Sequence, residues 1–135
     1  MKTLFAYLTL VGLLFCFSAA TPPAQPSTDV WVSKDPNTRS IVKMMFYNNR
    51  SRVRILASCS PNPCDWGVFS VRDLDPSGAN SPSEGHPYEI IVNQNTARRA
   101  IRLIERGYDM GITMQTTFKD RRPANETVGE LTRQF

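Results

Sequence analysis

The sequence is poor in the side chains that metal sites and enzymes use most. It contains one histidine, His86, and three cysteines among 135 residues. A zinc site needs three or four ligands, usually His or Cys, and Ser-His-Asp or other acid–base catalysis needs a base beside a nucleophile. The one conceivable catalytic group is His86 with Asp75 or Glu84, in a stretch with the composition of a surface loop. We therefore expect no catalytic residue, no metal and no cofactor, and a small hydrolase is the least favoured function.

Long apolar runs are missing too, except at the N-terminus. There, MKTLFAYLTLVGLLFCFSAA carries one positive charge at Lys2, then an apolar run from Leu4 to Phe17, then small residues up to Ala20. This order predicts a secretory signal peptide that is cleaved after Ala20, because a membrane anchor needs about 20 apolar residues. The mature protein is then secreted, to the extracellular space or the periplasm, without a membrane span.

Cleavage at this point divides the chain into three parts. Residues 1–20 are the predicted signal peptide. Residues 21–29, TPPAQPSTD, are Pro- and Ser-rich and predict a flexible lead-in. Residues 30–135 are enough for one domain with a hydrophobic core and no more.

Positive charge is mild but carried mainly by arginine. Processing removes Lys2 and leaves 15 Lys and Arg, one fewer than the 16 of the full chain, against 12 Asp and Glu. Arginine binds carboxylates, sulfates and phosphates through a planar fork better than lysine does. Seven arginines are candidates for binding an anionic polymer, a cell-surface component or another partner: Arg50, Arg52, Arg54, Arg98, Arg99, Arg102 and Arg106. Only their convergence into one patch would distinguish them from solvated charges on an outer strand face.

Alternating apolar residues predict strands along most of the chain. IVKMMFYN (41–48) and RVRILAS (52–58) alternate on either side of Asn48-Asn49-Arg50-Ser51, which predicts a hairpin with one buried face. DMGITMQTTF (109–118) predicts another strand with one apolar side. Residues 73–87 have the composition of a long loop, and long loops in compact domains are often functional.

Residues 95–107 favour two different structures. Ala97, Ala100, Ile101 and Ile104 have helical spacing, with a capping residue before them and a glycine after. As a strand, the segment puts only Ile101 and Leu103 on one face. Read locally, the pattern favours a helix.

The mature chain keeps two cysteines, Cys59 and Cys64, because Cys16 leaves with the signal peptide. A redox pair normally has two intervening residues at a helix N-terminus, whereas here four residues separate the cysteines and the flanks resemble strands. In a secreted chain this predicts a disulfide that closes a tight turn. Such a small loop contributes only about 2 kcal/mol, so its main effect would be to fix the turn and set Trp66 against the core.

Two motifs in this order resemble a known pattern. They comprise Trp31, Asp35-Pro36-Asn37-Thr38-Arg39 and Ile41, and then Cys59, Pro61, Cys64 and Asp65-Trp66-Gly67. They are similar to a family of small secreted, mostly bacterial β domains with the pattern W-x-N-x-D-x-x-T-R-G-I and then C-x-P-x-x-C-D-W-G. The segment TTFKDRRPANETVGELTRQ resembles the last two strands of that family. Ser33, Ser40 and Leu56-Ala57-Ser58 depart from the family's Asn, Gly and W-G-K. The resemblance implies a fold and no established activity.

The implied fold is mainly β, a single antiparallel barrel-like domain of about eight strands in which residues 97–105 form a strand. The expected strands are 30–33, 40–48, 51–58, 66–72, 88–93, 97–105, 108–118 and 127–133. Eight sequential strands suit an up-and-down barrel, which can hold one small ligand. A tryptophan in the first strand, Trp31, and an arginine in the last, Arg133, resemble lipocalin- and avidin-like barrels.

The expected function is that of a secreted, disulfide-stapled, non-enzymatic β-barrel binding module. Its ligand is an anionic surface, bound by the seven arginines, or a small apolar molecule in an interior cavity. The candidate cavity residues are Met44, Phe46, Met110, Ile112, Met114 and Phe118. The alternative is that these side chains pack against one another. A purely structural or interaction protein is the alternative function. Asn49 and Asn125 begin N-x-S/T sequons in predicted turns and are candidate glycosylation sites in a eukaryotic producer.

Overall fold

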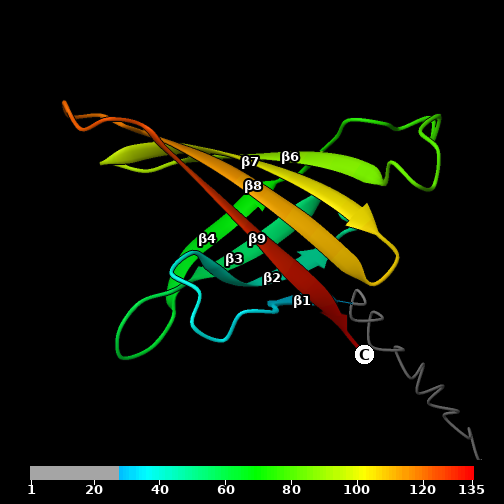
Figure 1. Cartoon of the computed structure of the whole chain (residues 1–135), viewed down its shortest axis with the longest axis horizontal. Helices are drawn as coiled ribbons and strands as arrows, with labels where there is room; N and C mark the ends of the chain where they lie inside the picture. The colour runs from blue at the N-terminus through cyan, green and yellow to red at the C-terminus, as the bar shows by residue number, and fades with distance from the viewer. Residues whose placement is uncertain (1–27) are drawn as a thin grey trace, which may run out of the picture.

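The computed structural model describes residues 28–135, so the predicted signal peptide and most of the predicted lead-in lie outside the described residues. Within this range every regular element is a β-strand, and the strands form one antiparallel sheet (Figure 1). The strands are β1 (Asp29–Ser33), β2 (Ile41–Tyr47), β3 (Arg52–Ala57), β4 (Cys64–Ser70), β5 (Arg72–Asp73), β6 (His86–Asn93), β7 (Ala97–Arg106), β8 (Asp109–Phe118) and β9 (Asn125–Gln134). The prediction of a mainly β, barrel-like domain is confirmed. No part of residues 28–135 forms a helix of the length and apolarity that a membrane crossing requires.

The sheet is an up-and-down barrel that is nearly closed. Its strand order is β4-β3-β2-β1-β9-β8-β7-β6-β5, so the first and last strands pair in the middle of the sheet. In Figure 1, β6 to β9 cross β1 to β4, which shows how the sheet folds over on itself. The hydrogen-bonded ladder is open only between β4 and β5. There the chain passes from one edge to the other at a single residue, Val71, whose N–H donates to the carbonyl of Ser51 at 2.9 Å.

Several strand boundaries differ from the prediction. β4 begins at Cys64 rather than at residue 66, and β9 spans Asn125–Gln134 rather than 127–133, so Asn125 lies in a strand and not in a turn. A ninth strand, the two-residue β5, pairs with β6, and β6 begins at His86 rather than at residue 88. The predicted loop 73–87 is therefore shortened to residues 74–85, and Asp73 and His86 are held in strands. At the N-terminus, β1 begins at Asp29, the last residue of the predicted lead-in.

Residues 97–106 form β7, which is hydrogen-bonded to β6 on one side and to β8 on the other. The local helical spacing is therefore not followed. As a strand, the segment points Ala97, Ile101 and Leu103 inward, and all three are completely buried. Pairing on both edges satisfies every ladder position, so tertiary context overrides a local propensity that favours a helix.

The barrel interior is filled by large apolar side chains. Trp31, Phe46, Ile55, Ile90 and Leu103 are at most 1% exposed and belong to one core cluster. Five of the six predicted cavity residues, all except Phe118, are members of the same cluster. They pack against other core side chains, as expected for a barrel whose strands enclose just enough space for them. Phe118 is half-buried at the end of β8.

Candidate functional site

The two ends of the barrel differ in chemistry. One end, at the start of β1 and the β2–β3 turn, is closed by a charged network that we call the plug: Asp29, Arg50, Tyr88, Glu105 and Arg133. The other end, near the β3–β4 and β8–β9 connections, keeps an open pocket that we call the mouth.

The plug depends on the β2–β3 turn. Asn48, Asn49 and Arg50 all have left-handed backbone, with φ of 51°, 53° and 64°. Asparagine adopts this conformation readily, whereas it strains an arginine. The turn carries the Arg50 side chain over the end of the barrel, so Arg50 does not belong to an outer arginine surface as the sequence suggested.

Arg50 is bound on all sides. Its guanidinium donates to both carboxylate oxygens of Glu105, to Oδ2 of Asp29 at 2.6 Å and to the Tyr88 hydroxyl at 3.2 Å. It also lies 5.8 Å from the ring centroids of Trp31 and Tyr88. Asp29 Oδ1 lies 2.8 Å from Nε of Arg133, although the geometry is that of an ion pair and not of a hydrogen bond. Two carboxylates therefore balance two guanidiniums.

The pKa values at the plug keep these charges fixed. Burial lowers the pKa of Arg50, but the hydrogen bonds to Glu105 and Tyr88 and the charge of Glu105 raise it by more, so the net shift is upward. Burial raises the pKa of Tyr88 above that of an ordinary tyrosine. Arg50 is therefore a permanent cation and Tyr88 stays neutral, which suits a structural closure rather than proton transfer.

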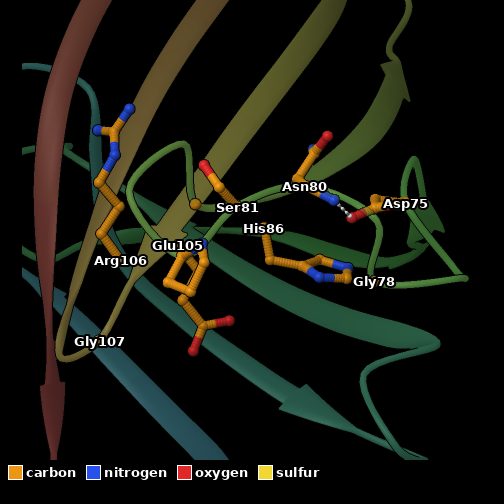
Figure 2. A pocket seen from close by; sticks show the side chains of 10 residues that line it. Asp75, Gly78, Asn80, Ser81, His86, Glu105, Arg106 and Gly107 are labelled. Atoms are coloured by element: carbon orange, nitrogen blue, oxygen red, sulfur yellow. Dashed lines mark hydrogen bonds between the residues drawn. The ribbon is translucent and has the colours of Figure 1, made fainter.

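A shallow pocket of about 340 Å³ lies beside the plug, between the loop of residues 74–85 and the β7–β8 turn (Figure 2). Its only histidine, His86, places Nε2 2.7 Å from Oδ1 of Asp73 and its ring 4.6 Å from that of Tyr88. The expected partner was Asp75 or Glu84, so that assignment is wrong. Ser81, the serine of this pocket, has its hydroxyl 2.9 Å from that of Ser83. Among residues 28–135, no hydrogen bond joins the His86–Asp73 pair to a serine, threonine or cysteine side chain.

Asp75 stabilises the loop of residues 74–85 instead of pairing with His86. Its carboxylate accepts hydrogen bonds from the backbone N–H groups of Ala79 and Asn80, both at 3.0 Å, and from the Ser77 hydroxyl at 3.3 Å. Figure 2 shows the carboxylate turned toward Asn80. The hydrogen bond from Asn80, followed by those from Ala79 and Ser77, lowers the pKa of Asp75.

The remaining six predicted arginines divide among three places. Inward and outward residues alternate along β7, so Arg98, Arg102 and Arg106 are exposed on the outer face, while Arg99 points inward with Ile101. On the outer face of β3, Arg52 donates to Ser70 at 3.3 Å and Arg54 lies 3.5 Å from Asp65. In the strand order of the sheet, β3 and β7 are not neighbours. The seven arginines therefore do not form one patch.

Arg99 reaches the mouth, a pocket of about 170 Å³. The pocket is lined by Arg39, Ser40, Ala57, Ser58, Trp66, Arg99, Met114, Thr116, Phe118, Asn125 and Thr127. The Arg99 guanidinium lies 4.6 Å from the Trp66 ring centroid and donates to the side-chain oxygen of Gln94. Sequence reasoning missed Arg39, Trp66 and Thr116 as site residues. They meet because four separate strand connections bring them to the same end of the barrel. For Arg99 the sequence does carry a signal, because alternation along residues 97–105 puts Arg98 and Arg99 on opposite faces of the strand.

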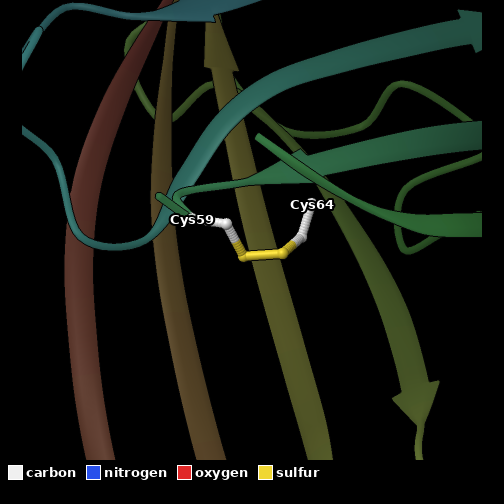
Figure 3. Close-up of a disulfide and its surroundings, with 2 residues drawn as sticks. All are labelled: Cys59 and Cys64. Atoms are coloured by element: carbon white, nitrogen blue, oxygen red, sulfur yellow. A yellow bond between two sulfur atoms is a disulfide. The ribbon is translucent and has the colours of Figure 1, made fainter. Parts of the chain in front are cut away.

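The disulfide holds one wall of the mouth. Cys59 and Cys64 are bonded, with 5.4 Å between their Cα atoms, as the sequence predicted (Figure 3). Cys64 opens β4 and faces Ala57 at the end of β3. Trp66 follows two residues later and packs against the core cluster. The bridge therefore fixes the start of the strand that presents Trp66 to Arg99.

Replacing Arg50 tests the plug. Arg50→Ala should lower the free energy of unfolding by on the order of 3 kcal/mol, because it leaves the largely buried Glu105 carboxylate without a cation and Asp29 with Arg133 alone. Urea denaturation measures this. Arg52→Ala, two residues away on the outer face, is the matched control and should cost less than about 0.5 kcal/mol. Equal losses for the two variants would contradict a stabilising plug.

Asp75 should titrate below the 3.8 of an unperturbed aspartate. Because its folded pKa is the lower one, its stabilising effect is complete above the unfolded pKa and is lost as pH falls through the folded pKa. Carbon-detected NMR of the carboxyl should give this midpoint, and the amide shifts of Ala79 and Asn80 should follow it. Asp75→Asn should abolish the amide transition. Amide shifts that do not follow the carboxyl titration would contradict the hydrogen bonds from Ala79 and Asn80 to the Asp75 carboxylate.

Removing the disulfide should cost little. The double change Cys59→Ser and Cys64→Ser should lower the free energy of unfolding by about 2 kcal/mol, since the closed loop is short. Reduced wild-type protein serves as the control and should match the double variant. Thiol titration of the unfolded, unreduced protein should find no free thiol, and finding two would disprove the bond.

Comparisons with known proteins do not supply an identity. The chain matches no family model, no curated protein and no solved structure. The resemblance carried by Trp31 and the cysteine turn therefore stays a prediction. Function has to be inferred from the geometry of the two barrel ends and the outer face.

Proposed function

We propose that the protein is a secreted, non-enzymatic β-barrel module that binds an anionic polymer or an anionic cell-surface component through the outer face of β7. Arg98, Arg102 and Arg106 supply the cations. Successive arginines are four residues apart, which is about 13 Å along an extended strand. They form a row of charges, which suits a partner that repeats its negative charge along a chain.

The observation that carries the proposal is that the neighbouring carboxylates are already engaged. Glu89 stands directly opposite Arg102 in the β6–β7 register, but its carboxylate pairs with Arg72 at 2.6 Å. Arg102 therefore lacks an ion-pair partner within residues 28–135. Its guanidinium can donate two hydrogen bonds to the oxygens of an external carboxylate, sulfate or phosphate.

The same holds at the other end of the row. Asp109 faces Arg106 in the β7–β8 register, but it lies 2.9 Å from Nζ of Lys34, which also contacts Glu130 at 3.1 Å. One lysine thus occupies both carboxylates. In the described part of the chain Arg106 forms no ion pair, but the group of Lys34, Asp109 and Glu130 keeps a net charge of −1 beside it. The uncancelled charge of the row therefore rests mainly on Arg98 and Arg102.

Space is available beside these arginines. Arg102 borders two shallow hollows of the outer face, of about 370 and 230 Å³. The larger hollow lies over Gly111 and Gly129, which have no side chain to fill it. A polymer could therefore approach the backbone of β8 and β9 while its anionic groups reach Arg102 and Arg106.

The other functions have less support. Five of the six side chains expected to line an interior cavity pack in the core, and Met114 and Phe118 border only the small mouth, which argues against a small apolar ligand inside the barrel. His86 pairs with Asp73, and among the described residues it makes no hydrogen bond to a serine, threonine or cysteine side chain, which argues against a hydrolase. A purely structural role is the outcome to be tested against binding.

Retention on a sulfated matrix tests the proposal. Arg98→Gln plus Arg102→Gln should move elution to clearly lower salt, because two charges that face the matrix are lost. Arg52→Gln plus Arg54→Gln is the matched control, since it removes the same charge from a distant face. That variant should elute like the wild type.

Each alternative outcome has a separate meaning. Equal shifts for both variants would show that retention follows net charge and would contradict a β7 site. A wild type that is not retained at low salt would contradict binding altogether and favour the structural role. Thermal unfolding of the two double variants checks that each protein is folded.

A further inference from the structure

The mouth contains an arginine whose charge is not balanced. Arg99 is half-buried, stacks on Trp66 at 4.6 Å and is held by the neutral side chain of Gln94. No carboxylate pairs with it in the described part of the chain. Burial alone lowers the pKa of Arg99. A partly desolvated guanidinium without a counter-charge is unfavourable, and a bound anion would remove that cost.

Strand register places polar groups beside Arg99. Arg99 faces Thr116 across β7 and β8, and Thr116 faces Asn125 across β8 and β9. These three residues form one row on the inner side of the sheet. Thr116 is only 4% exposed, so its hydroxyl is shielded from bulk solvent except through the mouth. The row offers a cation, a hydroxyl and an amide to one small volume.

The next row inward is apolar except at its end, Thr127. Ile101 faces Met114, and Met114 faces Thr127. Met114 is 5% exposed and lines the pocket together with Ala57. The pocket therefore has an apolar floor beneath a polar rim, and Arg39 and Ser40 from the β1–β2 connection complete the rim on the far side.

The size of the mouth limits what can enter. Its volume of about 170 Å³ corresponds to roughly five or six water molecules at ~30 Å³ each. Pockets for drug-sized ligands are larger, about 300–1,000 Å³. The mouth therefore admits one charged group with a few neighbouring atoms, and not a lipid chain.

We propose that the mouth is a second binding site, which takes the carboxylate or sulfate of an acidic sugar. Arg99 and Arg39 bind the anionic group. Thr116 and Asn125 bind the adjacent sugar hydroxyls. This site is separate from the outer arginine row, because Arg98 and Arg99 point to opposite sides of the same strand.

Titration calorimetry with small probes tests the site on mature protein made without N-glycosylation, because a glycan on Asn125 would cover the pocket. The probes are glucuronate, glucose 6-sulfate, neutral glucose and inorganic sulfate. At least one acidic sugar should bind more tightly than glucose and than inorganic sulfate, and the stronger of the two identifies the source of the charge. Weaker acrylamide quenching of Trp66, the partly exposed tryptophan, should accompany binding.

Arg99→Gln should weaken binding of that sugar at least tenfold, as expected for the loss of a hydrogen bond to a charged group. Arg98→Gln, its neighbour on the outer face, is the matched control and should change the affinity less than twofold. Arg39→Gln removes the second cation of the mouth. Arg39 is exposed on a loop, so its replacement does not disturb the core. It should also weaken binding, so the test does not depend on Arg99→Gln remaining folded.

Four results would overturn the proposal: no binding of any acidic sugar, equal binding of glucose, equal binding of inorganic sulfate, or equal losses for Arg98→Gln and Arg99→Gln. The outer row is judged separately. On a sulfated matrix whose polymer is not a sugar, and so lacks the hydroxyls that the mouth recognises, Arg99→Gln should leave retention nearly unchanged. The Arg98/Arg102 double variant should leave sugar binding unchanged. Failure of one site therefore does not count against the other.

Discussion

The ladder between β1 and β9 joins the two ends of the described chain. Val30 faces Gln134 and Ser33 faces Leu131, so the first strand lies beside the last and the sheet curves into a barrel. Because β1 begins at the barrel end, this pairing also places Asp29 between Arg50 and Arg133. The plug therefore depends on the pairing of the first strand with the last. The arginine stacked on Trp31 is Arg50, from a turn, and not Arg133 from the last strand.

The same barrel is left open at one position. β4 and β5 are neighbours in sequence but form opposite edges of the sheet. Trp66, Phe69 and Val71 pack against the core along this opening, so apolar side chains cover what hydrogen bonds do not. The disulfide stiffens the chain at the start of β4, and we infer that this rigidity matters for Trp66, which has to serve both the core and the mouth.

Alternation along one strand assigns different roles to adjacent arginines. On β7, Arg98 and Arg102 face solvent, whereas Arg99 faces the interior. A change of one residue in register would exchange these roles, and the continuous pairing of β7 with β6 and β8 prevents such a slip. The two proposed sites thus share one strand, ARRAIRLIER, whose arginines lie on the outer face at one site and on the inner face at the other.

The sequence by itself determined the strand pattern, the hairpin at residues 41–58, the disulfide and the apolar faces, because each depends on residues close together in the chain. For residues 97–106 the local spacing suits a helix, and only the resemblance to the secreted β domains predicts the strand. The tertiary structure supplies the physical reason, which is pairing with two neighbouring strands. It also decided that Arg50 closes the barrel and that Arg39, Trp66, Arg99 and Thr116 meet at its mouth. These residues lie on segments far apart in sequence. Their proximity depends on how the sheet curves and closes, and local patterns carry no information on that.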